Sequence, residues 1–292
     1  MKKIILFFVL IQTSLCVSQE LHQLEPASHH YASLKALSAL PNEKRAELDS
    51  MRFPESSYNP VALLYTMASP IYLTDNQVDG LKNLLKFPAN SSEQTQAELN
   101  FLLEWQKKRT KEQEYRTSKV LAPIGYWPHI DVMKDHKSYE ANIDDLLFEG
   151  REVMGAKVTH KNYPATTKLL KGITNDMRLM EFTIKYHLLR PRPYELEPKL
   201  EPLQIMGSPS FASGHTLWAY LHAFTWSELI PSKRAAFLAL AYEIGESREI
   251  MGIHYPSDDE ASRILAHAML TKMWSNTDFA SDLKAAQLEW RQ

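Results

Sequence analysis

The chain has 292 residues, of which 44% are hydrophobic and 23% charged, with 16 prolines but only 9 glycines. This length is enough for one large domain or two small ones with a full apolar core. The formal net charge of −2 gives no general attraction to nucleic acid or to an anionic membrane, so we predict neither as a partner and expect any anion to be bound locally.

Residues 1–18 are typical of an export signal. Two lysines precede an apolar run over residues 4–11, and Cys16 and Ser18 occupy the minus three and minus one positions of a cleavage site after Ser18. The run is too short to span a bilayer, and no later run of about 18 apolar residues follows it. We therefore expect a periplasmic or secreted bacterial protein, with an uncleaved anchor or a lipid on Cys16 as alternatives.

The rest of the chain divides into a polar extension and a helical domain. Residues 19–60 are polar and interrupted by proline, and we interpret them as an irregular N-terminal extension. Over residues 61–292 apolar residues recur every three or four positions, which predicts a single all-helical domain. In segment 121–129, prolines and a glycine break the pattern, and Tyr126 and Trp127 either line a substrate mouth or pack a loop. The helices are expected at 61–109 with a break at 87–92, and at 141–157, 167–189, 214–226, 233–251, 257–273 and 278–290.

A cluster of cations follows the helix predicted at 167–189. Lys185 lies in its last turn, and Arg190-Pro-Arg192-Pro193 stops the helix, so the basic side chains spread from its end. Such a cluster on its own commonly compensates the helix dipole.

A second segment offers a seat for an anion. Ser213 stands at the N-cap position of the next apolar helix, Gly214 lets a ligand approach the backbone, and the first amides of that helix are free to bind an anion. His215 lies at the rim of this seat.

A third segment places charged groups at a helix boundary. Arg248 falls within an apolar stripe of the helix predicted at 233–251, where a guanidinium needs an anionic partner from the protein or from a ligand. His254 follows, and Ser257 and Glu260 have the spacing of a capping box for the next helix. In its first turn Asp258 points back toward His254, which would hold one imidazole nitrogen as a donor and leave the other free to attack.

The order and spacing of these three segments resemble the signature of the type-2 phosphatidic acid phosphatase superfamily, which includes class A bacterial non-specific acid phosphatases and vanadium haloperoxidases. The resemblance covers a motif-bearing core at residues 165–275, and the flanking residues are most similar to the soluble acid phosphatases. Ala212 departs from the family's usual proline. The matching positions are Lys185, Arg192, Pro193, Ser213, Gly214, His215, Ser247, Arg248, His254 and Asp258.

The resemblance implies a helical bundle of the acid phosphatase and haloperoxidase type and a metal-independent hydrolysis of phosphomonoesters. His254 would be the nucleophile that forms a phosphohistidine, Asp258 would orient its ring, and His215 would be the general acid and then the base. No metal is expected, because cationic groups would take the place of a divalent ion. The expected phosphate-binding residues are Lys185, Arg192, Ser213, Gly214 and Arg248.

The sequence leaves several alternative functions open. A vanadium haloperoxidase would bind vanadate with the same residues, whereas vanadate would only inhibit a phosphatase. A lipid or pyrophosphate phosphatase of the same superfamily and a non-catalytic phosphate-binding helical protein are the others. The expected partner is a small phosphomonoester, and homo-oligomerisation is left open.

Overall fold

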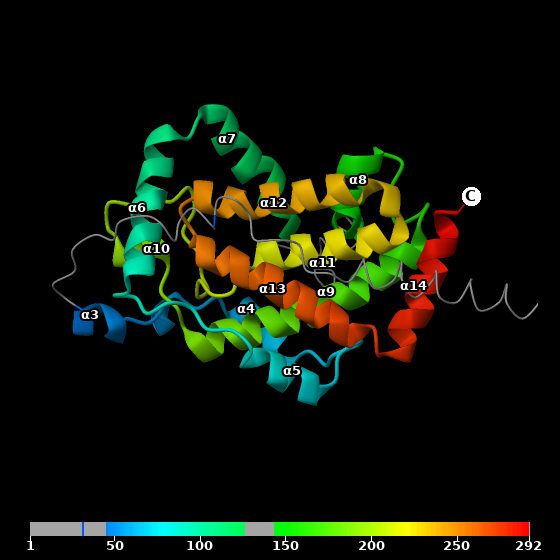
Figure 1. Cartoon of the computed structure of the whole chain (residues 1–292), viewed down its shortest axis with the longest axis horizontal. Coiled ribbons are helices and arrows are strands. Elements are labelled where there is room, and N and C mark those ends of the chain that lie inside the picture. The colour runs from blue at the N-terminus through cyan, green and yellow to red at the C-terminus, as the bar shows by residue number, and fades with distance from the viewer. Residues whose placement is uncertain (1–30, 32–44, 126–142, 292) are drawn as a thin grey trace, which may run out of the picture.

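The computed structural model of the chain describes residue 31, residues 45–125 and residues 143–291. Every regular element in these residues is a helix, which confirms the predicted all-α fold (Figure 1). Within the same residues, no helix has both the length and the apolar character that a membrane span requires. The signal predicted at residues 1–18 and the aromatic pair Tyr126 and Trp127 lie outside the described residues.

The helices predicted at 93–109, 167–189, 214–226, 233–251, 257–273 and 278–290 are each found within three residues of the predicted bounds, because their apolar periodicity is strong. The segment predicted as helical from residue 61 to the break at 87–92 differs, because it holds two short α-helices and a 3-10 turn, with no helix over residues 68–74. The segment predicted as one helix at 141–157 differs: it is a 3-10 turn at Ile143–Leu147 followed by a short α-helix. The α-helices are α3 (Arg45–Ser50), α4 (Pro60–Leu64), α5 (Asp75–Lys82), α6 (Glu93–Lys108), α7 (Lys111–Tyr115), α8 (Phe148–Met154), α9 (Pro164–Leu188), α10 (Pro193–Leu196), α11 (Gly214–Leu229), α12 (Arg234–Ile250), α13 (Pro256–Met273) and α14 (Thr277–Glu289).

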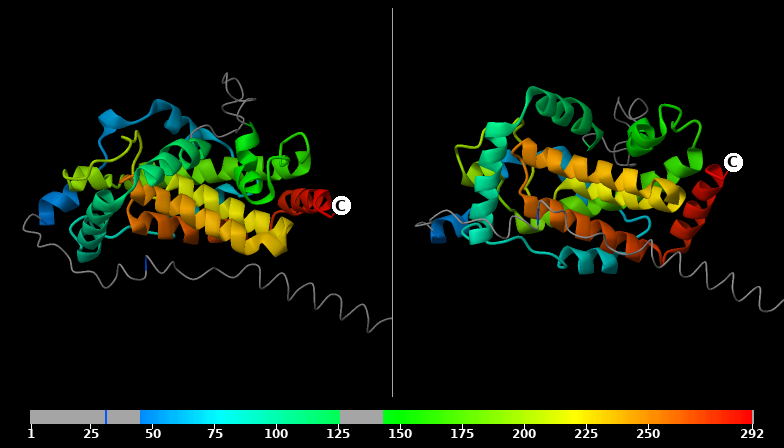
Figure 2. Two further views of the ribbon diagram at one scale, coloured as in Figure 1. Left: turned by 90° about the horizontal axis from the view of Figure 1, so that it is seen from above. Right: turned by 45° about the horizontal axis from the view of Figure 1, so that its top comes forward.

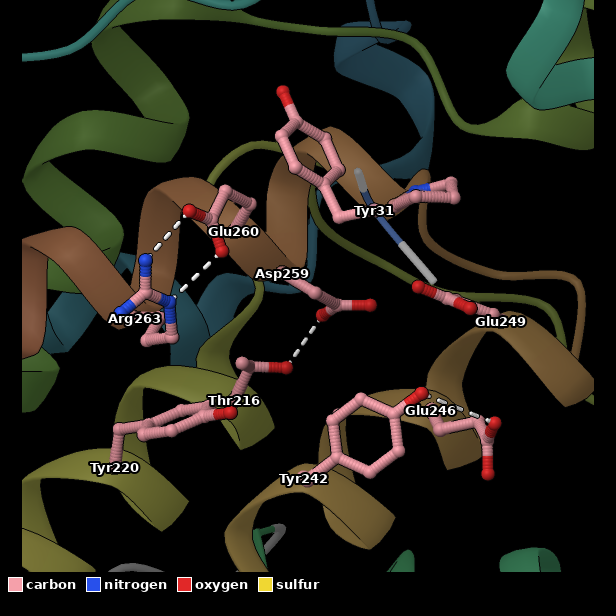
Figure 3. Close-up of a pocket in the computed structure, with 11 residues that line it drawn as sticks. Tyr31, Thr216, Tyr220, Tyr242, Glu246, Glu249, Asp259, Glu260 and Arg263 are labelled. Carbon is pink, nitrogen blue, oxygen red and sulfur yellow. Dashed lines mark hydrogen bonds and ion pairs between the residues drawn. The ribbon is translucent and has the colours of Figure 1, made fainter. Parts of the chain in front are cut away.

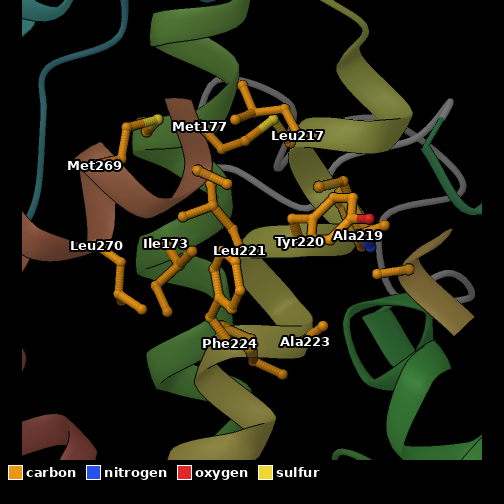
Figure 4. Close-up of a cluster of buried hydrophobic side chains, with 14 of the residues drawn as sticks. Ile173, Met177, Leu217, Ala219, Tyr220, Leu221, Ala223, Phe224, Met269 and Leu270 are labelled. Carbon is orange, nitrogen blue, oxygen red and sulfur yellow. The ribbon is translucent and has the colours of Figure 1, made fainter. Parts of the chain in front are cut away.

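Helix α11 is the centre of the bundle, and every one of its residues is buried. It is apolar on all sides, as a helix must be when neighbours surround it. It packs against α9, α12 and α13, and α14 packs against α9. Figure 4 shows how Leu221 and Phe224 of α11 meet Ile173 of α9 and Leu270 of α13 in the main apolar cluster.

Four helix ends meet at one end of this bundle, which lies on the left in Figure 1. α9 and α12 end there, and α11 and α13 begin there. Two residues with positive φ end the first pair of helices: Leu189 with φ 54° and Gly252 with φ 70°. α6 stands across this same end in both views of Figure 2. The positive charges carried by the three segments are therefore gathered at one end of the bundle.

The start of α13 corrects one prediction. Ser257 does not cap the helix: α13 begins at Pro256, and Asp258 accepts a hydrogen bond from the backbone N–H of Tyr255 at 3.1 Å. Proline at the first helical position fixes the entry of the chain, so the helix begins one residue earlier than predicted. The hydroxyl of Ser257 is left for other partners.

A residue of the last helix, α14, caps the N-terminus of α9. The Glu289 carboxylate accepts hydrogen bonds from the N–H groups of Ala165 (2.7 Å) and Thr166 (2.9 Å). The indole of Trp290 stacks on Tyr163 with ring centroids 4.0 Å apart. Free amides at a helix start need acceptors, and here a residue from α14 supplies them.

Candidate active site

His254 and Asp258 form the pair expected from their spacing. Nδ1 of His254 lies 3.0 Å from Oδ2 of Asp258, and both side chains are buried. A carboxylate only accepts hydrogen bonds, so the ring proton is on Nδ1 and the lone pair is on Nε2. The nucleophilic nitrogen of the expected mechanism is therefore the one turned away from Asp258.

Three further donors hold Asp258. Oδ1 accepts from Arg190 Nη1 at 2.6 Å, and Oδ2 accepts from Ser210 Oγ at 2.5 Å and from the N–H of Tyr255. Burial would raise the pKa of the Asp258 carboxyl, but the charge of Arg190 and the bonds from His254 and Ser210 hold this pKa well below its ordinary value. Asp258 is thus a carboxylate with a fixed orientation.

Arg192 contacts the other nitrogen of the His254 ring. Its Nη1 lies 2.9 Å from Nε2 of His254 and also donates to the carbonyl of Ile253 at 2.8 Å. The carbonyl of Ser208 accepts from Arg192 Nε at 2.8 Å. Burial, and then the charge of Arg192, lower the pKa of His254 well below its ordinary value. The ring is therefore neutral with Arg192 beside its lone pair, and attack through Nε2 requires this bond to be exchanged for one to a phosphoryl oxygen.

Lys185 reaches the same region from the last turn of α9. Its Nζ donates to the carbonyls of Pro209 at 2.8 Å and Ser210 at 3.0 Å, and it lies 3.9 Å from Glu181. Only 1% of this residue is exposed. Burial, followed by the charge of Arg192, lowers the pKa of Lys185 to about 7. The short loop that carries Ser210 thus contacts Lys185 with its carbonyls and Asp258 with its hydroxyl.

The start of α11 is partly as predicted. Ser213 is at the N-cap position, but its hydroxyl pairs with Thr216 Oγ1 at 2.8 Å and makes no cap bond. Gly214 lies against the Glu181 carboxylate so closely that an added Cβ would collide with it. The position therefore requires glycine for space. Arg178 holds Glu181 from the other side at 2.5 Å.

Arg248 and His215 lie near the π-helix Arg116–Leu121. Arg248 donates to Ser247 Oγ at 2.9 and 3.0 Å and to the carbonyl of Thr117 at 3.4 Å. His215 Nε2 lies 2.8 Å from the carbonyl of Ala122, so this nitrogen carries a proton. Burial and the charge of Arg248 lower the pKa of His215 well below its ordinary value, and His254 adds to the effect. His215 is therefore within electrostatic range of both Arg248 and His254.

Three residues of the site were not predicted. Arg190 and Ser210 both bind Asp258, and the motif segments contain both of them, so their positions beside Lys185, Arg192 and Ser213 are a usable signal. Glu98 of α6 accepts from Ser257 Oγ at 2.8 Å and lies 3.6 Å from Arg190. Nothing in the sequence around Glu98 indicates this contact.

Two cavities lie beside the predicted residues. A groove of about 400 Å³ between α7, the π-helix and α12 is lined by Thr117 and Ser247, the residues that hold Arg248, and by charged side chains that include Arg116 and Glu243. A second cavity of about 30 Å³ lies between Thr216, Glu249 and Asp259 (Figure 3). The second has room for only about two water molecules. Of the two, only the groove is large enough for part of a substrate.

The described residues contain no group of three or more His, Cys, Asp or Glu side chains placed to hold a metal ion. The gathered groups are instead guanidinium, ammonium and imidazole, which bind anions. A helical bundle that gathers such a cluster beside an oriented histidine has the groups that an oxyanion site requires.

Part of this chain is similar to known proteins. Residues 165–281 match the profile of the PAP2 superfamily, and the chain thus contains a domain of that superfamily. It is 30% identical over 145 residues to a non-specific acid phosphatase of Providencia stuartii, covering 48% of this chain and 58% of that protein. It is 28% identical over 157 residues to a non-specific acid phosphatase of Salmonella typhimurium strain LT2, covering 51% and 62%.

A solved structure supports the fold. The crystal structure described as the first bacterial vanadium-dependent iodoperoxidase is similar with a TM-score of 0.55 and 14% identity, covering 84% of this chain and 64% of that one. At this identity the likeness concerns the fold alone. The chain matches about 60% of the length of the two acid phosphatases.

Proposed function

We propose that the protein is an exported, metal-independent acid phosphatase that hydrolyses phosphomonoesters through a phosphohistidine. The observation that carries the proposal is the His254 ring held between two partners: Asp258 accepts from Nδ1 at 3.0 Å, and Arg192 lies 2.9 Å from Nε2. The first contact fixes the tautomer that a nucleophile needs. The second contact would put a guanidinium next to the oxygens of an attacked phosphoryl group. The names of the two acid phosphatases add support.

The reaction would proceed in two displacements. Nε2 of His254 attacks phosphorus, the ester P–O bond breaks, and the leaving alkoxide takes a proton from His215. Water then gives a proton to His215 and attacks phosphorus, the P–N bond breaks, and inorganic phosphate leaves. Lys185, Arg192 and Arg248, with the amides near Ser213 and Gly214, would neutralise the equatorial oxygens throughout.

His215 would gain its second ring proton when the substrate binds. Burial, followed by the charge of Arg248, keeps the pKa of His215 well below its ordinary value while no substrate is bound. A phosphate dianion bound between them would favour the imidazolium and raise this pKa. His215 would then be a charged acid only when a substrate is present, which suits activity at acid pH. The leaving group would extend toward the groove beside Ser247 and Thr117, which already hold Arg248.

The deciding experiment is covalent labelling with a ³²P-phosphomonoester in the wild-type protein and in His254→Ala. Alkaline quenching preserves phosphohistidine, so the wild type should be labelled and His254→Ala should be neither labelled nor active. His187→Ala, an exposed residue in the last turn of α9, is the matched control and should behave as wild type. A label that survives in His254→Ala would place the nucleophile elsewhere.

Two controls separate the alternatives. Bromide oxidation by peroxide with added vanadate, without phosphate release in its absence, would identify a haloperoxidase. Binding of inorganic phosphate with no cleavage of p-nitrophenyl phosphate would identify a binding protein. Export is tested separately by cell fractionation and N-terminal sequencing, where processing after Ser18 is expected.

A further inference from the structure

Glu98 joins the network around Asp258 from outside residues 165–281, the range that matches the superfamily. It lies on α6, and 159 positions separate it from its partner Ser257. The side chain is fully buried. Burying a carboxylate is costly unless it is paired, so its partners indicate what it does there.

The contacts form a chain that leads to the nucleophile. Glu98 Oε2 accepts from Ser257 Oγ at 2.8 Å and lies 3.6 Å from Arg190 Nη2. Arg190 Nη1 donates to Ser257 Oγ at 2.9 Å and to Asp258 Oδ1 at 2.6 Å. Asp258 in turn binds Nδ1 of His254. The guanidinium of Arg190 thus stands between two carboxylates.

Glu98 accepts hydrogen bonds at both of its oxygens. Gln94 Nε2 donates to Oε1 at 3.1 Å. The hydroxyl of Ser257 has one proton and already accepts from Arg190, so it donates to Oε2. This pattern fits the ionised carboxylate. Arg190 itself is fixed by the ring of Tyr255, 3.8 Å from its carbon atom Cζ.

The charges explain why two carboxylates are needed. Arg190 and Asp258 alone form a neutral pair, and such a pair gives less stabilisation to a histidine that becomes positive than an unbalanced carboxylate gives. With Glu98 present the three groups carry a net charge of −1. We propose that Glu98 is a positioning residue that balances Arg190, so that the charge of Asp258 remains available to the His254 ring as it becomes phosphoimidazolium. This inference rests on the proposed function.

Other charged groups lie near Glu98 and His254, the two ends of this series of contacts. The ring of His254 is influenced by Arg192, Lys185 and Asp258. Burial raises the pKa of Glu98, and the charge of Arg190 and the hydrogen bonds from Ser257 and Gln94 oppose this rise. Asp258 also acts on Glu98, which in turn influences Glu249 and Tyr31. None of these residues is changed in the test, so a change in the titration of His254 reports the loss of the charge at Glu98.

The test compares Glu98→Gln, which keeps the shape and removes the charge, with Glu98→Asp, which keeps the charge and shortens the side chain. Glu104→Gln, on the same helix and paired only at the surface with lysines, is the matched control. We expect Glu98→Gln to lower kcat about tenfold or more, the effect of about 1.4 kcal/mol. Because His254 attacks in its neutral form, the acid limb of the kcat/KM profile should also move to lower pH. Glu98→Asp should keep more activity and the wild-type acid limb.

A role in shape alone would give the opposite order, with Glu98→Asp the more damaged variant and the acid limb unmoved; that result, or wild-type kcat in Glu98→Gln, overturns the inference. If Glu98→Gln does not fold, Glu98→Asp decides, and a shifted acid limb there overturns it. NMR titration of the His254 ring separates this inference from the proposed function. Even if no phosphomonoester is cleaved, a lower pKa of the ring in Glu98→Gln than in Glu104→Gln supports the inference, and equal values refute it.

Discussion

Replacing Lys185 by Met should abolish phosphate turnover and also make the protein more stable at acid and neutral pH. Lys185 is buried, and burial lowers its pKa to about 7 from an ordinary value of 10.5. At about 1.4 kcal/mol per pH unit, this interval corresponds to about 5 kcal/mol of unfolding free energy lost to the buried charge below pH 7. The carbonyls of Pro209 and Ser210 each lose a hydrogen bond in the variant, and at about 0.5–1.5 kcal/mol per bond the two losses together cost about 1–3 kcal/mol.

The net gain is therefore about 2–4 kcal/mol below pH 7. For a domain of this size 1 kcal/mol changes Tm by about 2–4 °C, so Tm should rise by about 4–16 °C. Between pH 7 and 10.5 the unfolded chain binds a proton at Lys185 that the folded chain does not, so the wild type becomes relatively more stable as pH rises. The advantage of the variant should thus decrease by about 1.4 kcal/mol per pH unit over this window.

Thermal unfolding followed by circular dichroism from pH 5 to 10 measures this difference. Lys168→Met is the control on the same helix, because Lys168 is exposed and pairs with Asp282 at the surface. It should leave both activity and Tm close to wild type. A Lys185→Met protein that is less stable than wild type at pH 6, or whose difference from wild type does not change with pH, would refute the reasoning.

Three other changes test separate parts of the site. In Gly214→Ala the added methyl group would collide with the Glu181 carboxylate. kcat/KM should fall about tenfold or more, as a loss of about 1.4 kcal/mol of transition-state stabilisation would give. Unchanged inhibition by inorganic phosphate would contradict this prediction. His215→Gln should slow alkyl phosphates by about 100-fold or more and p-nitrophenyl phosphate much less, whereas equal losses would exclude an acid role. Burial, followed by the charge of Glu249, raises the pKa of Asp259, so the stability that the proton on this carboxyl group gives is present at acid pH and lost as pH rises. In Asp259→Asn the fall of Tm toward neutral pH should therefore be less steep. An unchanged slope of Tm against pH would contradict this prediction.

The helices could be predicted because their periodicity is local information. The apolar stripe of α12 is visible in the sequence, and Arg248 within it is fully buried. The His254 and Asp258 pair also follows from local geometry, since a side chain in the first helical turn leans toward the N-terminus. Both findings depend on residues fewer than five positions apart.

Contacts between distant segments could not be predicted in the same way. Glu98 occupies a polar position in a pattern whose apolar residues predict only a helix, and its role depends on where α6 crosses the bundle. The prediction that Ser257 caps α13 is wrong for a related reason. Its spacing to Glu260 suggests a cap, but the tertiary structure offers its hydroxyl Arg190 and Glu98 instead. Glu181 is similar, because only the approach of α11 shows that it faces Gly214.

The closure of α9 by Glu289 has a consequence for biosynthesis. The acceptor for the amides of Ala165 and Thr166 lies more than 120 positions further along the chain. A ribosome makes α9 long before it makes Glu289, so the first turn of this helix has no such acceptor while the nascent chain grows. The helix that carries Lys185 therefore has its N-terminal amides paired only in a chain whose synthesis has passed Glu289.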